Sequence, residues 1–303
     1  MVKSLQALKL SLIKFLNSEN EGETMPLKNY LSAQEKIDFN EDGYIFRRRL
    51  FNKKEILNIM KSLEGDPLIK NNLFDREDDD GNKTISVQWN QPGNSSYGVG
   101  ARMERVVTPV QEFLGGEVYH WHSKVTAKAP HEGGAWEWHQ DYGYWYHHGC
   151  LYPDMMSVMI ALDKSTKENG CLKVLKGSHL IGRIDHVSKV LENGDKGQVC
   201  ADLERIKWAE EKHETVFCEM EPGDALFFHG NTLHSSSANT SDKRRWALLY
   251  CYNKVSNNPF VQTHQPFYNK LTIADENAIE INGIEFADGS ENFQSQYTKS
   301  KKE

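Results

Sequence analysis

Short apolar runs separated by turn residues dominate the chain after the Gly115-Gly116 pair. These runs are candidate strands, and they cover residues 118–127, 136–138, 156–162, 172–175, 215–219, 225–229 and 246–252. Many short strands at this spacing are typical of a closed or double-sheet β fold. The pattern therefore predicts a mainly β protein with a jelly-roll sandwich at its core.

Before this point the spacing of apolar residues is helical rather than alternating. Residues 33–39 and 53–63 carry the helical period, a short strand is predicted between them at 44–46, and helical character returns at 96–113 and again at 201–212. Residues 75–94 begin with an acidic run and are rich in Gly and Asn, which predicts mostly loop. We therefore expect N-terminal helices to cover one face of the sandwich.

The length of the chain suits one large domain. Core burial per residue improves with size up to about 250–300 residues, and the chain has 303. We expect the domain over residues 31–270 and a C-terminal extension over 271–303. Residues 1–30 form a leader in which apolar residues such as Leu5, Leu8 and Phe15 are interleaved with lysines. An ordinary terminal helix or a poorly ordered leader is favoured over a targeting signal, because arginines and a small-residue cleavage site are missing.

Composition narrows the classes of partner. The net charge of -7 comes from 43 acidic and 36 basic residues, with no basic block that could follow a phosphate backbone, so nucleic acid is not an expected partner. The five cysteines contain no CxxC pair, which favours a reducing, cytoplasmic location. Since no apolar run reaches the roughly 18 residues of a membrane span, no membrane insertion is expected. A small-molecule substrate is the expected partner, and the oligomeric state is left open.

A candidate metal site lies in the motif Trp138-His139-Gln140-Asp141. On a strand or at its end, His139 and Asp141 project to the same face because they are two residues apart. His234, at the end of a distant apolar run, can supply a third ligand, and His229 in the same run is its rival. Two imidazoles and one carboxylate on one face of an octahedron leave room for a bidentate oxoacid and O2, which suits Fe(II).

A candidate anion site follows His234 along the chain. The turn Glu221-Pro222-Gly223-Asp224 leads into the run that ends at His234, and Arg245 lies on a later predicted strand. A guanidinium can hold a carboxylate with two parallel charge-assisted hydrogen bonds. Strand alternation sends Arg244 and Arg245 to opposite faces, so only one of them can enter the pocket.

With these motifs in order, residues 40–265 resemble the phytanoyl-CoA dioxygenase family, including its ectoine-hydroxylase-like members. The resemblance rests on the motif 138–141 with Tyr142 and Trp145 after it, on Asn169-Gly170-Cys171-Leu172 and Lys176-Gly177-Ser178-His179, and on residues 222–245. It implies a double-stranded β-helix core that uses Fe(II), 2-oxoglutarate and O2.

Carried over by position, the resemblance implies His139, Asp141 and His234 as iron ligands. It implies Arg245 as the arginine that holds 2-oxoglutarate, with Ser236 as its hydroxyl partner. This spacing favours His234 over His229. His122 and Lys124 stand where ectoine-type members have glutamine and arginine, so ectoine itself is not the expected substrate.

The remaining candidates surround the metal motif. Lys124, Thr126 and Trp136 are candidates for binding the oxoacid, since Lys124 and Thr126 alternate with His122 on one strand face. His122, Tyr142 and Trp145 are candidates for binding substrate. One hypothesis is that Trp145 faces a cationic substrate group through cation-π attraction; the alternative is ordinary core packing.

The expected activity is hydroxylation of an aliphatic C–H bond of a small polar metabolite, with release of succinate and CO2. The runner-up outcomes are desaturation, epimerisation or ring formation with the same cofactors. An acyl-CoA hydroxylase is a further alternative, although no Lys/Arg cluster near the motif suggests a binding site for CoA phosphates. The last alternative is a metal-binding jelly roll without catalysis, which would not need an arginine clamp for an oxoacid.

Overall fold

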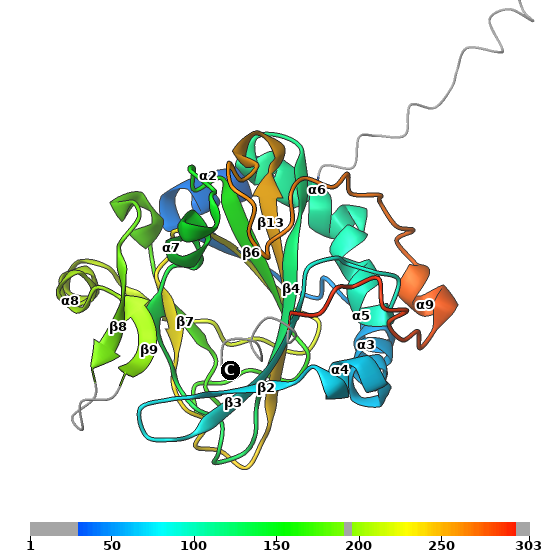
Figure 1. Cartoon of the computed structure of the whole chain (residues 1–303), viewed down its shortest axis with the longest axis horizontal. Helices are drawn as coiled ribbons and strands as arrows, with labels where there is room; N and C mark the ends of the chain where they lie inside the picture. Colours follow the sequence, from blue (N-terminus) through cyan, green and yellow to red (C-terminus); the bar gives the residue numbers. More distant parts are fainter. Residues whose placement is uncertain (1–29, 191–195, 295–303) are drawn as a thin grey trace, which may run out of the picture. The chain divides into compact units, whose positions relative to one another are not determined.

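Two antiparallel β-sheets face each other in the computed structural model, which describes residues 30–190 and 196–294 (Figure 1). The large sheet has the strand order β1 (Tyr44–Arg47), β11 (Ala225–His229), β6 (Met155–Ala161), β13 (Arg245–Lys254), β4 (Val118–Lys128), β3 (Lys83–Trp89) and β2 (Phe74–Glu77). The smaller sheet has the order β10 (Thr215–Phe217), β7 (Leu172–Leu175), β12 (His234–Ser236) and β5 (Trp136–His139). A separate hairpin pairs β8 (His186–Val190) with β9 (Lys196–Ala201).

The two sheets share a core at one end of the sandwich. Met159 of β6, Leu226 of β11 and Leu249 of β13 are buried together with Val174 of β7. These positions alternate along their strands with residues that face the other side of the sheet, as a two-residue side-chain period requires. Met159 and Leu249 also border a cavity with a mostly polar lining, and this part of the space between the sheets contains the candidate site.

Helices cover the outer face of the large sheet. They are α2 (Ala33–Asp42), α3 (Lys53–Gly65), α4 (Pro67–Asn71), α5 (Ser96–Val99), α6 (Glu104–Leu114) and α9 (Ala278–Asn282), with the 3-10 turn η1 (Gly100–Arg102) between α5 and α6. A capping box of Asn52 and Glu55 starts α3, and α6 ends at Gly115 with φ 65°, a left-handed conformation that glycine adopts without strain. Two further helices, α7 (Asp141–Trp145) and α8 (Leu203–Lys212), belong to the sheet connections.

Most of the predicted elements are present. The strands predicted at 172–175 and 225–229 have the observed bounds, and the helix predicted at 201–212 is α8. The helix predicted at 96–113 is interrupted, because Met103 is extended (φ -72°, ψ 139°) between η1 and α6. The strands β8, β9 and β12 were not predicted; β12 is three residues long and polar, so it carries no apolar run.

The prediction of mostly loop at 75–94 was wrong. This segment contains most of the β2–β3 hairpin, which forms one edge of the large sheet. On β3 the polar residues Thr84, Ser86 and Gln88 alternate with Ile85 and Val87. Because the inward face of this hairpin is polar, its pattern does not look like that of a core strand, and the acidic run at its start strengthens the loop prediction.

The described residues from 33 onward form one compact unit, and the described part of the predicted C-terminal extension packs within it. Asn58 donates a hydrogen bond to Ile279 O (2.9 Å), and Ala287 N donates to Asp66 Oδ2 (2.7 Å). The predicted leader lies outside the described residues except for Tyr30, and the domain boundaries stay predictions. Among the described residues no helix is long and apolar enough to cross a membrane.

Candidate active site

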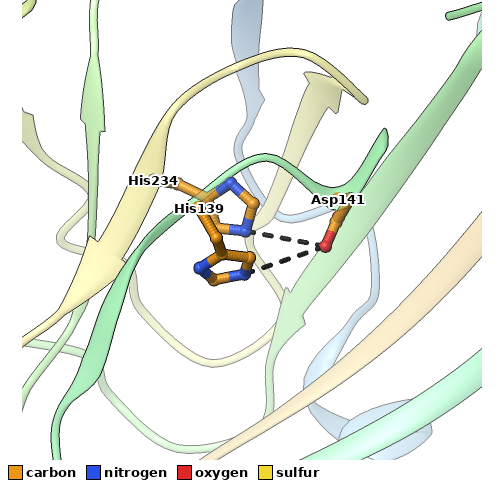
Figure 2. Close-up of side chains that lie close together, drawn as sticks. All are labelled: His139, Asp141 and His234. Atoms are coloured by element: carbon orange, nitrogen blue, oxygen red, sulfur yellow. Dashed lines mark ion pairs between the residues drawn. The ribbon is translucent and has the colours of Figure 1, made fainter. Parts of the chain in front are cut away.

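Three side chains from three separate elements converge between the sheets (Figure 2). His139 ends β5 and His234 begins β12, and the two residues lie opposite each other in the antiparallel pairing of these strands. Asp141 begins α7, two residues after His139. Asp141 Oδ1 lies 3.9 Å from His139 Nε2 and 3.8 Å from His234 Nε2. All three side chains are buried, and their ligand atoms lie within 4.8 Å of one another.

The local fold around the motif holds these ligands in place. Gln140, which lies between His139 and Asp141 in the sequence, is fully buried. It donates hydrogen bonds to Gly182 O and Asn231 O and accepts one from Ile184 N. A larger residue at Gly143 would be blocked, since an added Cβ would lie 1.8 Å from the ring of His186. The chain between β5 and α7 is therefore fixed by its neighbours.

Both histidines present a free Nε2 to the centre. Nδ1 of His139 lies 2.7 Å from Glu137 O, and Nδ1 of His234 lies 2.9 Å from Thr232 O. A carbonyl oxygen only accepts, so each Nδ1 carries the hydrogen and each Nε2 keeps its lone pair for a metal. Burial lowers the pKa of both imidazoles, with repulsion from His234 adding to the effect on His139, which favours the neutral form that binds metal.

The carboxylate is oriented from the large sheet. Ser157 of β6 donates its hydroxyl to Asp141 Oδ2 at 2.6 Å, leaving Oδ1 directed toward the two imidazoles. Two neutral nitrogens and one carboxylate oxygen make a donor set that suits ferrous iron. The residues present therefore fit an iron ion with open coordination positions. Each of the three side chains is oriented by one hydrogen bond from the atom that does not face the centre.

A small cavity opens beside the triad, and we call it the inner chamber. Its volume is about 40 Å³, enough for a few water-sized groups such as one carboxylate. Its polar lining comprises Thr84, Lys124, Thr126, Lys128, Trp136, His139, His234, Ser235, Ser236 and Arg245, with no acidic residue among the described ones.

Arg245 is the buried cation of the inner chamber, with an exposed fraction of 4%. Its guanidinium donates to Thr126 Oγ1 (3.3 Å) and Gly170 O (2.8 Å), while its Nε has no partner among the described residues. Arg244 points out of the sheet and pairs with Glu64 and Asp163. The expectation that alternation admits only one of the two arginines is confirmed.

Lys128 is a second buried cation in the same chamber, and the sequence interpretation missed it. It is 1% exposed and donates to Ser236 Oγ at 2.8 Å and to Ser237 O. Burial, together with repulsion from Arg245, lowers the pKa of Lys128. Because the lysine uses the Ser236 oxygen as acceptor, the Ser236 hydroxyl hydrogen is left for another acceptor. The two-residue alternation that singled out Lys124 and Thr126 extends to Lys128, so a signal was present.

A larger cavity of about 220 Å³ also reaches the triad, and we call it the outer chamber. It shares Lys124, Trp136 and His139 with the inner chamber. Its other lining residues are Arg76, Gln88, His122, Asp141, Tyr144, Trp145, His148, His264, Gln265 and Gln294. The predicted candidates His122 and Trp145 therefore line a cavity that reaches the triad.

Two other predicted candidates lie elsewhere. Tyr142 lines neither chamber: it packs in a core cluster and donates its hydroxyl to Cys150 O at 3.1 Å, and Tyr144 is the tyrosine in the outer chamber. His229 is not part of the triad, and its Nδ1 accepts a hydrogen bond from Asn231 N. Cation-π contacts were predicted at Trp145. In the outer chamber the basic side chains Arg76 and Lys124 lie over the ring of Trp136 instead.

Comparison with known proteins identifies the family of this chain. The sequence profile of the family described as Phytanoyl-CoA dioxygenase (PhyH) matches residues 39–247. The chain belongs to the phytanoyl-CoA dioxygenase family. Within that match lie all three residues of the triad and both buried cations of the inner chamber.

Relatives of this phytanoyl-CoA dioxygenase family member include characterised enzymes. L-proline trans-4-hydroxylase of Streptomyces griseoviridis is 35% identical over 182 residues, which are 55% of this chain and 66% of that protein. Ectoine dioxygenase of Sphingopyxis alaskensis is 26% identical over 78% of this chain and 82% of its own length. The chain thus spans just under two thirds of the proline hydroxylase and more of the ectoine dioxygenase.

Solved structures agree on the fold of this family member. EctD from S. alaskensis, solved with 2-oxoglutarate and 5-hydroxyectoine, matches with a TM-score of 0.66 and 23% identity, over 82% of this chain and 89% of that one. A second structure of EctD carries bound Fe. The predictions of the family and of the jelly-roll fold are confirmed. The predicted dioxygenase class agrees with the names of the relatives, and the predicted iron and 2-oxoglutarate agree with what the EctD structures hold.

Proposed function

We propose that this protein hydroxylates an aliphatic C–H bond of a small polar metabolite, using Fe(II), 2-oxoglutarate and O2. The observation that carries the proposal is the buried His139, Asp141 and His234 triad, which is reached by a small cationic chamber and by a larger chamber that adjoins it. The relatives named a proline hydroxylase and an ectoine dioxygenase support a small polar substrate. When bound, iron with its co-substrates supplies the oxidising chemistry that yields hydroxylated product, succinate and CO2.

In this proposal the chain's own residues bind and orient. His139, His234 and Asp141 hold the ion, and Ser157 fixes the carboxylate. Arg245, Lys128 and Ser236 hold the far carboxylate of 2-oxoglutarate in the inner chamber, which offers unused donors and no competing acid among the described residues. The metabolite occupies the outer chamber, beside His122 and Trp145.

The inner chamber is lined mostly by buried residues and carries positive charge, so a carboxylate there interacts more strongly than it does in water. The two chambers adjoin at Lys124, Trp136 and His139, so a co-substrate in one and a metabolite in the other would lie close together, as the reaction requires. The proposed cytoplasmic location is supported by five free, buried cysteines.

The test is succinate release by anaerobically purified protein supplied with Fe(II), then with 2-oxoglutarate, air and a metabolite extract. We expect succinate to form and a metabolite to gain one oxygen atom, detected by mass spectrometry. Loss of hydrogen without gain of oxygen would indicate desaturation or ring formation instead. Absence of succinate under every iron-replete condition would remove the enzymatic proposal, and His234→Ala is the matched negative control.

A further inference from the structure

Two cations lie over a single indole ring at the junction of the two chambers. The Arg76 guanidinium carbon is 4.4 Å from the centroid of the Trp136 ring, and Lys124 Nζ is 4.9 Å from the same centroid. Arg76 comes from β2, the edge strand that the sequence pattern did not predict, and Lys124 comes from β4. Two positive charges around one ring repel each other, and the ring compensates only part of that cost.

Neither cation has an acidic partner among the described residues. No carboxylate oxygen lies within ion-pair distance of Arg76 or Lys124 in the described chain, whereas nearby Lys83 pairs with both Asp75 and Glu77. Those two acids are adjacent to Arg76 in sequence, but strand alternation directs them to the opposite, exposed face. The polar group that Arg76 acts on is the hydroxyl of Tyr144, which is neutral. The charge on the inward face is therefore uncompensated.

The position of Arg76 separates it from the oxoacid. Arg76 lines the outer chamber and not the inner one, whereas Lys128 and Arg245 line the inner chamber and not the outer one. Each chamber thus has its own buried or half-buried arginine, and Lys124 lies between them. An anion held by Arg76 is a second anion, different from the far carboxylate of 2-oxoglutarate.

The rest of the outer chamber is neutral and rich in hydrogen-bonding groups. His122 is 6% exposed, and its Nδ1 has no partner among the described residues. Gln88, Gln265 and Gln294 add amide groups that can donate or accept. Asp141, an iron ligand in the proposed function, is the single acid among the described lining residues. A purely cationic substrate would find repulsion here and no counter-charge.

We propose that Arg76, assisted by Lys124, binds the carboxylate of the substrate, and that the substrate is a small carboxylic acid such as an amino or imino acid. The inference rests on the proposed function, because it assigns the outer chamber to the substrate. A guanidinium matches a carboxylate with two parallel hydrogen bonds. The volume of about 220 Å³ lies below the range of pockets that take drug-sized ligands, so the whole substrate is small.

Binding can be measured without turnover, by anaerobic calorimetric titration of protein loaded with Fe(II) and 2-oxoglutarate. The probes are small L-amino and imino acids, each paired with its own carboxamide, which keeps size and amine but removes the negative charge. We expect at least one acid to bind, its amide to bind at least ten-fold more weakly, and Arg76→Gln to weaken the acid at least ten-fold. Arg76→Lys should restore part of the affinity, and Arg205→Gln on exposed α8 is the matched control.

The outcomes separate this inference from the proposed function. Equal binding of acid and amide, unchanged affinity in folded Arg76→Gln, or no binding by any acid would overturn the carboxylate assignment. Thermal melting of each variant shows whether it is folded, and Arg76→Lys carries the test if Arg76→Gln is not. Protein that releases succinate but binds no acid fails this inference alone, whereas protein that binds acids but never forms succinate fails the proposed function.

Discussion

The inner and outer chambers both reach the triad, and they differ in how their cations are held. In the inner chamber Lys128 and Arg245 are almost completely buried and bonded to neutral oxygens of Ser236, Thr126 and Gly170. In the outer chamber Arg76 is half-buried on an edge strand and rests on an aromatic face. Hydrogen bonds to buried oxygens therefore hold the inner cations, whereas the outer one lies at the edge of the sheet.

This difference matches what each chamber is proposed to bind. A co-substrate that is the same in every turnover suits a rigid chamber, whose buried charges are costly until an anion arrives. A chamber built from an edge strand and connecting segments can change its lining without disturbing the sheets. Of the four predictions that follow, the first three test how far the chambers act separately and the last concerns a residue outside them, from the largest expected effect to the smallest.

Removal of a triad residue should disable both chambers together. His234→Ala should lower succinate formation by more than about a thousand-fold and abolish stoichiometric iron binding, because the metal contributes several kcal/mol to the reaction. Iron content by mass spectrometry and succinate release measure the two effects. The control His229→Ala should keep its iron; loss of iron there with retention in His234→Ala would reverse the ligand assignment.

Removal of the inner lysine should affect the co-substrate first. Lys128→Met should raise the KM for 2-oxoglutarate about 10- to 100-fold, the value of one charge-assisted hydrogen bond. It should also reduce the rise in melting temperature that 2-oxoglutarate gives the iron-loaded protein. Lys83→Met on the exposed face of β3 should behave as the parent. An unchanged KM in Lys128→Met would show that Arg245 acts without the lysine.

Loss of the hydrogen bond to the carboxylate ligand should weaken the metal without emptying the site. Ser157→Ala should lower iron affinity about ten-fold, at the low end of the range for groups that orient metal ligands. Competition with a chelator of known affinity measures the change. Ser165→Ala removes another buried serine, one whose hydroxyl has no partner among the described residues and lies outside both chambers. Equal affinity in the two variants would contradict the role of Ser157.

The smallest effect concerns stability at a buried histidine outside both chambers. Burial lowers the pKa of His120 to about 4, whereas an unfolded histidine titrates near pH 6.5. Between these values the unfolded chain binds the extra proton, so stability falls as pH drops from about 6.5 toward 4. His120→Gln should reduce this slope by at most about 1.4 kcal/mol per pH unit. Urea unfolding between pH 7 and 5 measures it, and identical slopes would contradict the assignment.

The sequence predicted those site residues whose position in the strand pattern and whose side-chain chemistry both point to the site. His139 and Asp141 share a strand end, and His234 closes an apolar run, so a metal site could be proposed from spacing. Arg245 and Arg244 could be expected on opposite faces of their strand, because the alternation of side chains depends only on neighbouring positions. Lys128 could have been found by extending the same alternation on β4.

Other residues could not be assigned by local rules. Tyr142 and Tyr144 are both aromatic and adjacent to the motif, yet Tyr142 enters the core and Tyr144 enters the outer chamber. Arg76 was not considered as a site residue because it lies in a segment that was predicted to be loop. The polar inward face of the β2–β3 hairpin resembles an exposed surface. An active-site wall inverts the usual pattern of apolar residues inside, so hydrophobic periodicity fails where the chemistry is.

By itself the amino-acid sequence determined the fold class, the family and three candidate metal ligands, because strand alternation and the spacing of motifs are properties of short segments. Which side chains share a chamber was decided by tertiary structure. The pairing of β2 with β3 and of β3 with β4 brings Arg76 and Lys124 to one indole ring, and the pairing of β4 with β13 sets Lys128 opposite Arg245. The distribution of the cations between the two chambers is set only when these distant strands pair in register, since no local pattern encodes which residue lies across a sheet.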